Sequence, residues 1–456
     1  MVFDAIIEQA AKVLPVSAMV RSILENCLSA QALDELFEQH RRFQYKRTLL
    51  FSTVVHLLTV VVSKVYPSMS AAVAAMQERL DVSDTSIWNK LNGTDPEVSA
   101  ALVRTSASRL SEIMDGLGSL PNSLLAGYRI RILDGNCIAS SEHRLKALRD
   151  TSSGPLPGKV LAILDPQRRL VVQIIPCLDG HAQERSLLPF VFPSMAEGDL
   201  WIADRNFCTT EFFAQAQRRS VAVILREHKS LPWNSVTEPA LADSSGKLFE
   251  QSVIIPTADG NQVTARRIVL HLPKATRDGD KHITLLTTLP SEHASAQQIA
   301  DLYAERWTIE THFGMMSRAL SAEIPTLGYP KAAVLALAVG FVAANIIALI
   351  HATLQAAHPN VDIEQSVSDI RIAEAVQRTY DGMMAMSGED AWVPFQTLSV
   401  PMMVAWLLRC AASISLPRFR KAGRGPKKPQ PPRSLHQGST HVSTTRLLYI
   451  QQGAKS

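Results

Sequence analysis

The hydrophobic pattern of this chain changes once, near Gly127, and that change limits the folds that the chain can form. Residues 1 to about 125 carry apolar side chains at three-to-four spacing, which predicts helices. After Gly127 the apolar residues form short runs that end in turn residues, which is typical of strands. Strands are predicted over residues 128–133, 159–164, 170–175, 200–203 and 221–225, and a helix over 209–219.

The order strand, strand, strand, helix, strand, helix, strand predicts a ribonuclease-H-like sheet, with its first three strands antiparallel and its later strands parallel. Further strand signals interrupt this order at about 226–290, where two apolar runs flank the turn dipeptide Asp259-Gly260. One long helix is predicted over 295–320 and another over 332–350. We therefore expect an α/β fold: a ribonuclease-H-like core with a β-rich insertion, flanked by an N-terminal helical domain and C-terminal helices.

Four regions follow from these patterns. We expect a helical domain over 1–125, a ribonuclease-H-like domain over 126–330 with its insertion at about 226–290, a helical region over 331–415 and a basic flexible tail over 416–456. Within the first region, residues 68–80 and 84–92 have the outline of a helix-turn-helix. That motif suits DNA binding, but the same outline also occurs where helices merely pack together.

Positive charge is concentrated in the tail. The formal net charge is +4, and the stretch from Arg418 to Arg433 holds seven basic residues and no acid, so the rest of the chain carries −3. A basic stretch rich in Pro and Gly is typical of a flexible arm for a polyanion, although a solubilising tail has the same composition.

Composition excludes several classes of protein. With 46% hydrophobic and 19% charged residues, the chain is not wholly disordered. Its five cysteines never form a C-x-x-C pair, which argues against a disulfide scaffold and against a structural zinc site. No signal peptide is visible, and the Ala-rich run 332–350 is expected to be a buried helix, although a membrane span remains the alternative. We therefore expect a cytoplasmic protein without a membrane partner.

Three acids lie beside apolar residues, where a carboxylate is costly unless it binds a ligand or takes part in a reaction. Asp134 and Asp204 each follow an apolar strand, and Glu310 lies within the predicted long helix. In a ribonuclease-H-like sheet the ends of the first and fourth strands are neighbours, so the three carboxylates would converge. Such oxygen ligands hold Mg²⁺ or Mn²⁺, and a pair of these ions clamps both oxygens of a phosphoryl transfer. Each acid alone also has an ordinary explanation, as a turn residue, a helix cap or a surface acid.

Tyr303, Arg306 and Glu310 are spaced three and four residues apart. On an ideal helix they fall within roughly 60° of one another, on one stripe. A basic residue beside a metal-binding acid suits a place where a DNA phosphate approaches carboxylates. The ordinary alternative is an ion pair between Arg306 and Glu310.

The run Tyr303-Ala-Glu-Arg306-Trp-Thr-Ile-Glu310 resembles the Y-x2-R-x3-E-x6-K signature of DDE transposases of bacterial insertion sequences, specifically of the fourth insertion-sequence family. Asp134-Gly135-Asn136 resembles the first acidic motif of that family, and Asp204-Arg205-Asn206-Phe207 resembles the second. The resemblance spans about residues 125–345 and includes the long gap before Glu310, where the family carries a β-rich insertion.

The resemblance implies cut-and-paste DNA transposition. Asp134, Asp204 and Glu310 would be the catalytic residues and would bind two Mg²⁺ or Mn²⁺ ions, while Tyr303 and Arg306 would hold phosphates near the cleaved end. The implied partners are double-stranded DNA, as inverted-repeat ends and as target, and a second copy of the chain in a synaptic complex. The implied location is the bacterial cytoplasm, on the nucleoid when DNA is bound.

The sequence departs from the signature at its last position, where Ser317 replaces lysine. The nearest base, Arg318, lies about 80° from Glu310 around an ideal helix and would supply the phosphate contact instead. Because of Ser317, a catalytically inactive DNA-binding relative remains the alternative. Trp233 is the candidate platform for a flipped base, unless it belongs to the core, and Trp307 is expected to pack.

The segment Asp179-Gly180-His181-Ala182-Gln183-Glu184 places a histidine between two acids. A separate metal site would need ligands on one face, and this spacing does not match a regular ligand face. The alternative is a polar loop at the rim of the active site.

Overall fold

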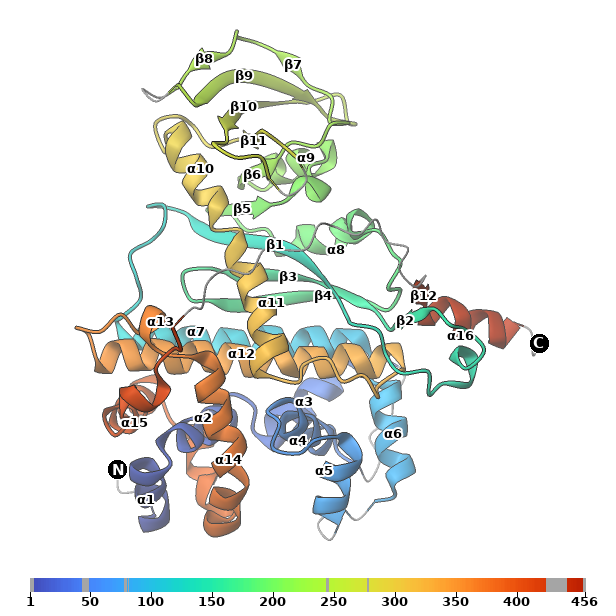
Figure 1. Ribbon diagram of the computed structural model, residues 1–456, viewed down its shortest axis with the longest axis vertical. Coiled ribbons are helices and arrows are strands. Elements are labelled where there is room, and N and C mark those ends of the chain that lie inside the picture. Colours follow the sequence, from blue (N-terminus) through green and yellow to red (C-terminus); the bar gives the residue numbers. More distant parts are fainter. Residues whose placement is uncertain are drawn as a thin grey trace.

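The fold is known from a computed structural model, which describes residues 4–42, 49–77, 80, 82–242, 246–276, 279–423 and 441–453. Among these residues a ten-stranded sheet has the order β4-β3-β1-β5-β6-β11-β10-β9-β7, with β8 paired to β9 (Figure 1). The strands of its core half are β1 (Arg129–Cys137), β3 (Lys159–Asp165), β4 (Leu170–Cys177), β5 (Asp199–Ala203) and β6 (Ala222–Arg226).

The pairing of these strands confirms the predicted ribonuclease-H-like core. Strands β1, β3 and β4 are antiparallel neighbours, whereas β5 and β6 run parallel to β1 and to each other. In the parallel pair Leu133 lies opposite Ala203, so the residues that follow them on β1 and β5 leave the paired region at the same edge of the sheet.

The β-rich insertion continues the same sheet. Strand β11 (His282–Thr287) pairs antiparallel with β6, and the hairpin of β9 (Leu248–Pro256) and β10 (Gln262–His271) extends the sheet further. The predicted turn at Asp259-Gly260 is present, and Gly260 has a φ of 81°, a conformation that favours glycine. The short strands β7 (Asn234–Ser235) and β8 (Ala240–Leu241) border β9.

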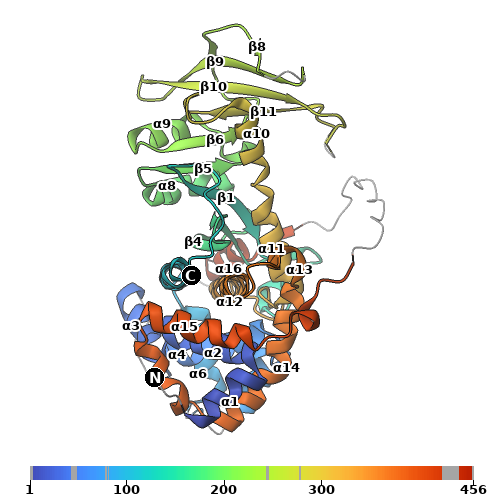
Figure 2. The same cartoon turned by 90° about the vertical axis from the view of Figure 1, so that its left-hand side faces the viewer.

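The two faces of the core sheet are covered by different helices (Figure 2). Leu133, Trp201 and Val223 face α8 (Leu188–Val191) and α9 (Thr210–Arg218) in one apolar cluster. Their neighbours Ile132, Ile202 and Ile224 face the other way, in the cluster that contains Ile299 and Ile309. Those two residues lie on α10 (Ala296–Ala304) and α11 (Trp307–Ala319). The alternation of side chains along each strand therefore determines which face of the sheet each side chain points to.

The rest of the molecule is helical and lies below the sheet in Figure 1. Helix α12 packs against α7 and α4. The helices that precede the core domain in the sequence and those that follow it therefore form one body. Helix α12 is long and apolar enough to cross a membrane, but 89% of its most apolar window is buried in the protein, the pattern of a core helix. The helices of this body are α1 (Ala5–Val13), α2 (Pro15–Cys27), α3 (Ala30–His40), α4 (Phe51–Val62), α5 (Met69–Met76), α6 (Asp84–Gly93), α7 (Pro96–Leu117), α12 (Pro330–Ala357), α13 (Ile363–Ser366), α14 (Asp369–Ser387) and α15 (Val400–Ala412).

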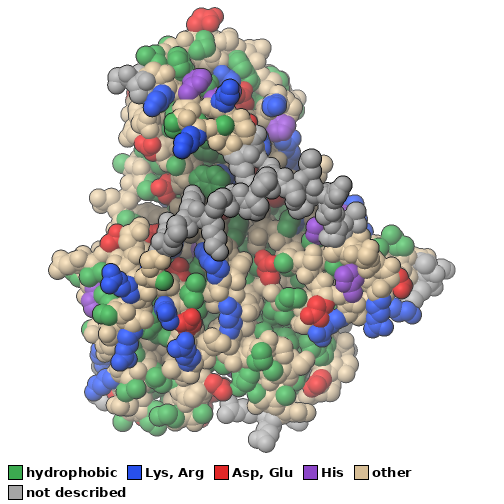
Figure 3. Space-filling view, viewed as in Figure 1, with side chains coloured by type: hydrophobic (Ala, Val, Ile, Leu, Met, Phe, Trp, Pro, Cys, Tyr) green, Lys and Arg blue, Asp and Glu red, His purple; other side chains and the backbone are tan. Residues whose placement is uncertain are grey.

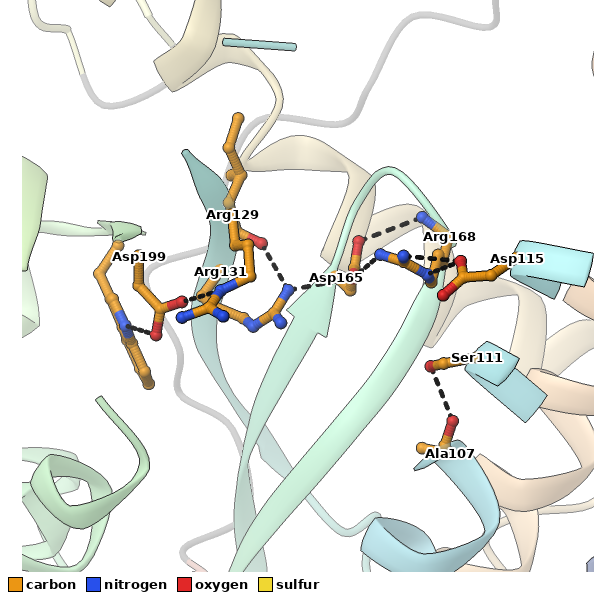
Figure 4. A network of polar contacts seen from close by, with 10 residues as sticks. Ala107, Ser111, Asp115, Arg129, Arg131, Asp165, Arg168 and Asp199 are labelled. Atoms are coloured by element: carbon orange, nitrogen blue, oxygen red, sulfur yellow. Dashed lines mark hydrogen bonds and ion pairs between the residues drawn. The ribbon is translucent and has the colours of Figure 1, made fainter. Parts of the chain in front are cut away.

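A network of ion pairs joins this helical body to the sheet (Figure 4). Asp165, at the end of β3, accepts bonds from Arg131 and Arg168, each at 3.0 Å. Arg168 also binds Asp115 on α7 at 2.7 Å. Since Asp165 is only 5% exposed, the network holds β1, the β3–β4 turn and α7 in one fixed arrangement.

Two predicted elements are wrong in their limits. Strand β1 continues past Asp134 to Cys137, because β3 supplies partners as far as Lys159. The predicted single helix over 295–320 is broken between α10 and α11, because backbone bonds around Arg306 change to the tighter i→i−3 pattern.

The tail also differs from its prediction. Residues 441–453 form β12 (His441–Ser443) and α16 (Thr444–Gly453), and β12 pairs with β2 (Gly154–Leu156) of the core domain. The predicted flexible tail is therefore wrong for these residues, because backbone hydrogen bonds to β2 fix them. Of its basic stretch, Arg424, Lys427, Lys428 and Arg433 lie outside the described residues, as does Asp81 of the predicted helix-turn-helix break.

Candidate active site

Asp134 lies on β1 and faces α11. Its Oδ1 atom accepts the backbone N–H of Gly135 at 2.9 Å, and its Oδ2 atom accepts Nη1 of Arg306 at 2.9 Å. The side chain is 18% exposed. The pKa of Asp134 is raised to about 6. Burial is the largest cause, Arg306 and the Gly135 N–H act in the opposite direction, and the nearby charges of Asp204 and Glu310 add to the rise.

Asp204 follows β5 at the same edge of the sheet. It is the N-cap of the short turn Arg205–Phe207, and its Oδ1 atom accepts the backbone N–H of Asn206 at 2.6 Å. The predicted position at the end of an apolar strand is correct. The predicted alternative, a helix cap, is present for the short turn Arg205–Phe207, whereas α9 has Thr209 as its N-cap.

Glu310 lies in the first turn of α11 and is joined to Asp134 through Arg306. Nη2 of Arg306 donates to Oε1 of Glu310 at 2.9 Å, while Nη1 of the same guanidinium binds Asp134. Arg306 is 8% exposed, and Glu310 has 43% of its side chain exposed. Two of the three predicted acids, Asp134 and Glu310, are therefore joined by a buried arginine, and Asp204 is near enough for its charge to raise the pKa of Asp134.

Two aromatic rings flank this arginine. The guanidinium carbon lies 4.9 Å from the ring centre of Trp307 and 6.0 Å from that of Tyr303. Tyr303 is buried, and that burial raises the pKa of its phenol. The prediction that Trp307 packs is wrong, since it is 59% exposed: α11 begins at Trp307, which turns the ring away from the core.

The other predicted DNA contacts lie apart from this centre. Ser317 is exposed, and its hydroxyl donates to the carbonyl of Phe313 at 3.2 Å. The Arg318 guanidinium folds back along α11 and lies over Gly314, where an added Cβ would be 2.9 Å from its Nη1 atom.

Trp233 belongs to a second cluster, in the insertion. Its indole N–H donates to Oε1 of Glu227 at 2.7 Å, and the Arg267 guanidinium carbon lies 4.9 Å from the ring centre. Arg267 in turn binds Oε2 of Glu227 at 2.9 Å. The half-buried ring also packs on the apolar cluster that includes residues of β5 and β6, so core contact is present, and a platform for a flipped base stays a prediction.

The loop 179–184 lies at the rim of the site. A Cβ added at Gly135 would lie 2.1 Å from Oε1 of Glu184, so this carboxylate fills the space that a side chain on β1 would occupy. The amide of Asn206 donates to Oε2 of Glu184 at 3.2 Å. His181 is exposed and Asp179 pairs with Arg446, so the loop does not gather ligands for a separate metal. The sequence placed Glu184 in this loop and Asn206 in the second acidic motif, but it did not predict the contact between them or the contact of Glu184 with Gly135.

The donor set suits a hard divalent cation, since Asp134, Asp204 and Glu310 supply carboxylate oxygens only. Among the described residues, no three His, Cys, Asp or Glu side chains lie close enough together in this conformation to hold a metal ion. Arg306 lies between Asp134 and Glu310, so a shared cation requires its guanidinium to leave at least one of them.

The chain was compared with family models, curated proteins and solved structures. Residues 126–346 match the family model described as the transposase DDE domain, a match that covers just under half of the chain. No curated protein matches the chain. Among solved structures, the chain is similar to a piggyBac transposase in a synaptic complex with hairpin DNA, studied by cryo-electron microscopy. That similarity has 10% sequence identity and a TM-score of 0.39, and covers 81% of this chain and 82% of that one.

Proposed function

We propose that this chain is a DNA transposase of the DDE type, which cleaves and joins DNA strands at the inverted-repeat ends of an insertion sequence. The observation that carries the proposal is the buried Arg306 that binds both Asp134 and Glu310, with Asp204 near enough to raise the pKa of Asp134. The domain match over residues 126–346 supports the same reaction class. Assignment to the fourth insertion-sequence family rests on the Tyr303–Glu310 run, on the two acidic motifs at Asp134 and Asp204, and on the long gap before Glu310.

In this proposal Asp134, Asp204 and Glu310 hold two Mg²⁺ or Mn²⁺ ions. When bound, such a pair activates the attacking oxygen and stabilises the leaving oxygen of an in-line phosphoryl transfer. Arg306 has two roles: it holds Asp134 and Glu310 before the reaction, and it offers its guanidinium to a phosphate once they are engaged. Tyr303 supports the guanidinium from its buried side.

The proposed partners are double-stranded DNA, as ends and as target, and a second copy of the chain. Basic side chains are spread over the helical half of the face seen in Figure 3, which suits a phosphate backbone. The N-terminal helical domain, through α5 and α6, and the basic tail are the proposed sites of sequence recognition and of backbone contact. This substrate implies a bacterial cytoplasmic protein that lies on the nucleoid when bound.

The test is strand cleavage on DNA that carries the ends flanking the gene. Purified protein with Mg²⁺ or Mn²⁺ should cut at the ends, and Asp204→Asn should bind the ends without cutting them. Binding without cutting by the natural protein would favour the catalytically inactive relative that Ser317 allows. Absence of both binding and cutting would refute the proposal.

A further inference from the structure

We infer that Glu184 and Arg185 are positioning residues that set the carboxylate of Asp204 by holding Asn206 between them. The inference rests on the proposed function, because it concerns the second acid of the proposed catalytic triad. Neither residue lies in the Asp134, Asp204 or Tyr303–Glu310 motifs. The two come from the loop between β4 and α8, which the chain brings to the edge of the sheet where β1 and β5 end.

The first step of the argument is the bond from Asn206 to Asp204. The Asn206 backbone N–H reaches Oδ1 of Asp204 at 2.6 Å, close enough to fix the rotation of that carboxylate. A shift of Asn206 therefore turns Asp204 as well. The orientation of an acid decides which of its oxygens can face a cation, so the position of Asn206 matters to the site.

The second step is that consecutive residues of the loop hold Asn206 at two points. Its side-chain amide donates to Oε2 of Glu184 at 3.2 Å, and its backbone carbonyl accepts Nε of Arg185 at 2.6 Å. Both contacts carry a formal charge on the loop side, and charge-assisted bonds are stronger than neutral ones. Asn206 is exposed, so these bonds rather than core packing determine where it lies.

The third step links Glu184 to the first acid. Side chains alternate along β1, so Asp134 faces α11 and Gly135 faces the opposite side. On that side the Glu184 carboxylate lies against the Gly135 backbone, where a Cβ would approach its Oε1 atom to 2.1 Å. Glu184 thus contacts the residue that follows Asp134, and it also contacts Asn206, whose N–H is bound by the cap residue Asp204.

The loop itself is anchored from outside the site. The C-terminal helix α16 contributes Arg446, whose Nη2 atom lies 2.8 Å from Oδ2 of Asp179, and Thr445, whose hydroxyl donates to the carbonyl of Leu178 at 2.6 Å. From β3, Lys159 donates to the carbonyl of Ala182 at 2.5 Å. Because the loop is bonded to both β3 and α16, Glu184 and Arg185 have fixed positions. They can therefore hold Asn206 in one place, whereas a loop without these bonds could not.

The test measures Mn²⁺ binding to the full-length protein on its end DNA, by electron paramagnetic resonance, beside the Mn²⁺ dependence of end cleavage. Removing a partner that orients a metal ligand costs about 10- to 100-fold in metal affinity, and Glu184→Ala should show a loss of that size. Glu184→Gln, which keeps an acceptor for Asn206, should retain most of the affinity. The matched control is Glu211→Ala, which removes another glutamate that accepts a side-chain amide, from Gln215 at 2.6 Å on α9.

A double-variant cycle tests the route through Asn206. Asn206→Ala should lower Mn²⁺ affinity as Glu184→Ala does, and the double variant should be no worse than Asn206→Ala alone. Additive losses would overturn the inference, because Glu184 would then act independently of Asn206. If Glu184→Ala loses its thermal unfolding transition, Arg185→Ala tests the same clamp from its other contact.

The failure of the inference is separable from failure of the proposed function. If the natural protein binds no Mn²⁺, or if Asp134→Asn binds it unchanged, the proposed function is wrong. If the natural protein binds Mn²⁺, Asp134→Asn does not, and Glu184→Ala behaves like Glu211→Ala, only the positioning role is wrong.

Discussion

Two arginines, one in the core domain and one in the insertion, are each covered by a tryptophan, but different numbers of carboxylates hold them. In the Arg306 cluster, the guanidinium binds Asp134 and Glu310 and lies 4.9 Å from the ring centre of Trp307. A third carboxylate, Asp204, is near enough to raise the pKa of Asp134. Acids therefore outnumber the base that they surround.

The Arg267 cluster in the insertion has one acid for one base. Arg267 binds Glu227 through both carboxylate oxygens and lies 4.9 Å from the ring centre of Trp233. Glu227 also accepts the indole N–H, so a single carboxylate satisfies both partners. This balanced arrangement fixes an aromatic ring and leaves no excess charge.

The difference in the ratio of acids to bases indicates which kind of ligand each cluster can bind. An excess of carboxylates beside the largely buried Asp134 is costly unless a cation arrives to balance it. A balanced ion pair carries no such cost and serves instead to hold a stacking surface in place. The same three residue types thus produce a reactive centre in one region and a rigid support in the other.

The largest expected effect comes from removing one acid of the Arg306 cluster. Asp134→Asn or Glu310→Gln should lower end cleavage by roughly 10⁴-fold or more while end binding persists, since a cluster that acts as a unit fails when one member is lost. Gel-shift and cleavage assays on the same DNA would measure both.

The matched control is Glu250→Gln, the same kind of change in an ion pair with Arg266 of the insertion, at 2.6 Å. It should leave cleavage nearly intact. If either triad variant still cleaves, or if Glu250→Gln is equally inactive, the contrast between the two regions is wrong.

The second effect is a pH dependence confined to the Arg306 cluster. With a pKa of about 6, Asp134 is ionised above that pH and protonated below it. Only the ionised form can bind a cation, so Mn²⁺ affinity should be constant above about pH 7 and fall up to about tenfold per unit below pH 6. Mn²⁺ titrations from pH 5 to 8 would measure it, and a flat profile across pH 6 would contradict the assignment.

The third effect concerns the Arg267 cluster. If Trp233 stacks a flipped base, Trp233→Ala should cost about 1–3 kcal/mol in the cleavage step, and Trp233→Phe, which keeps a ring face, should cost less. DNA ends with an abasic site at each position near the cut supply the control. At the position of the flipped base the loss should vanish, and an undiminished loss on every abasic substrate would assign Trp233 to the core alone.

The sequence predicted those features that depend on local pattern. The strand order and the end of β5 at Asp204 followed from apolar runs that stop at turn residues. The break at Arg306 did not, because helical spacing continues across it, and the tighter backbone bonds accompany the contacts of Arg306 with residues far along the chain.

Long-range contacts also explain the other misses. Gly135-Asn136 has turn composition, yet both residues pair with β3, so β1 could not be extended to Cys137 from the sequence. Glu184 approaches β1 where Gly135 leaves room, a contact between a loop and a distant strand that no spacing rule contains.

The smallest expected effect comes from restoring the missing base of the signature. Position 317 is seven residues after Glu310, about 20° from it around an ideal helix, so Ser317→Lys adds a charge on the face of the Arg306 cluster. Arg318 folds back over Gly314 and does not occupy that position. One further phosphate contact should tighten end binding and steepen the salt dependence of log Kd by about one unit.

The control is Thr311→Lys, which adds the same charge to α11 about 100° away from Glu310. A salt titration of end binding with all three proteins separates a specific contact from a general gain in attraction. Parallel slopes for the two lysine variants would mean that Ser317 faces no phosphate. The residues of the Arg306 cluster would then contact DNA, and the last turn of α11 would add no phosphate contact.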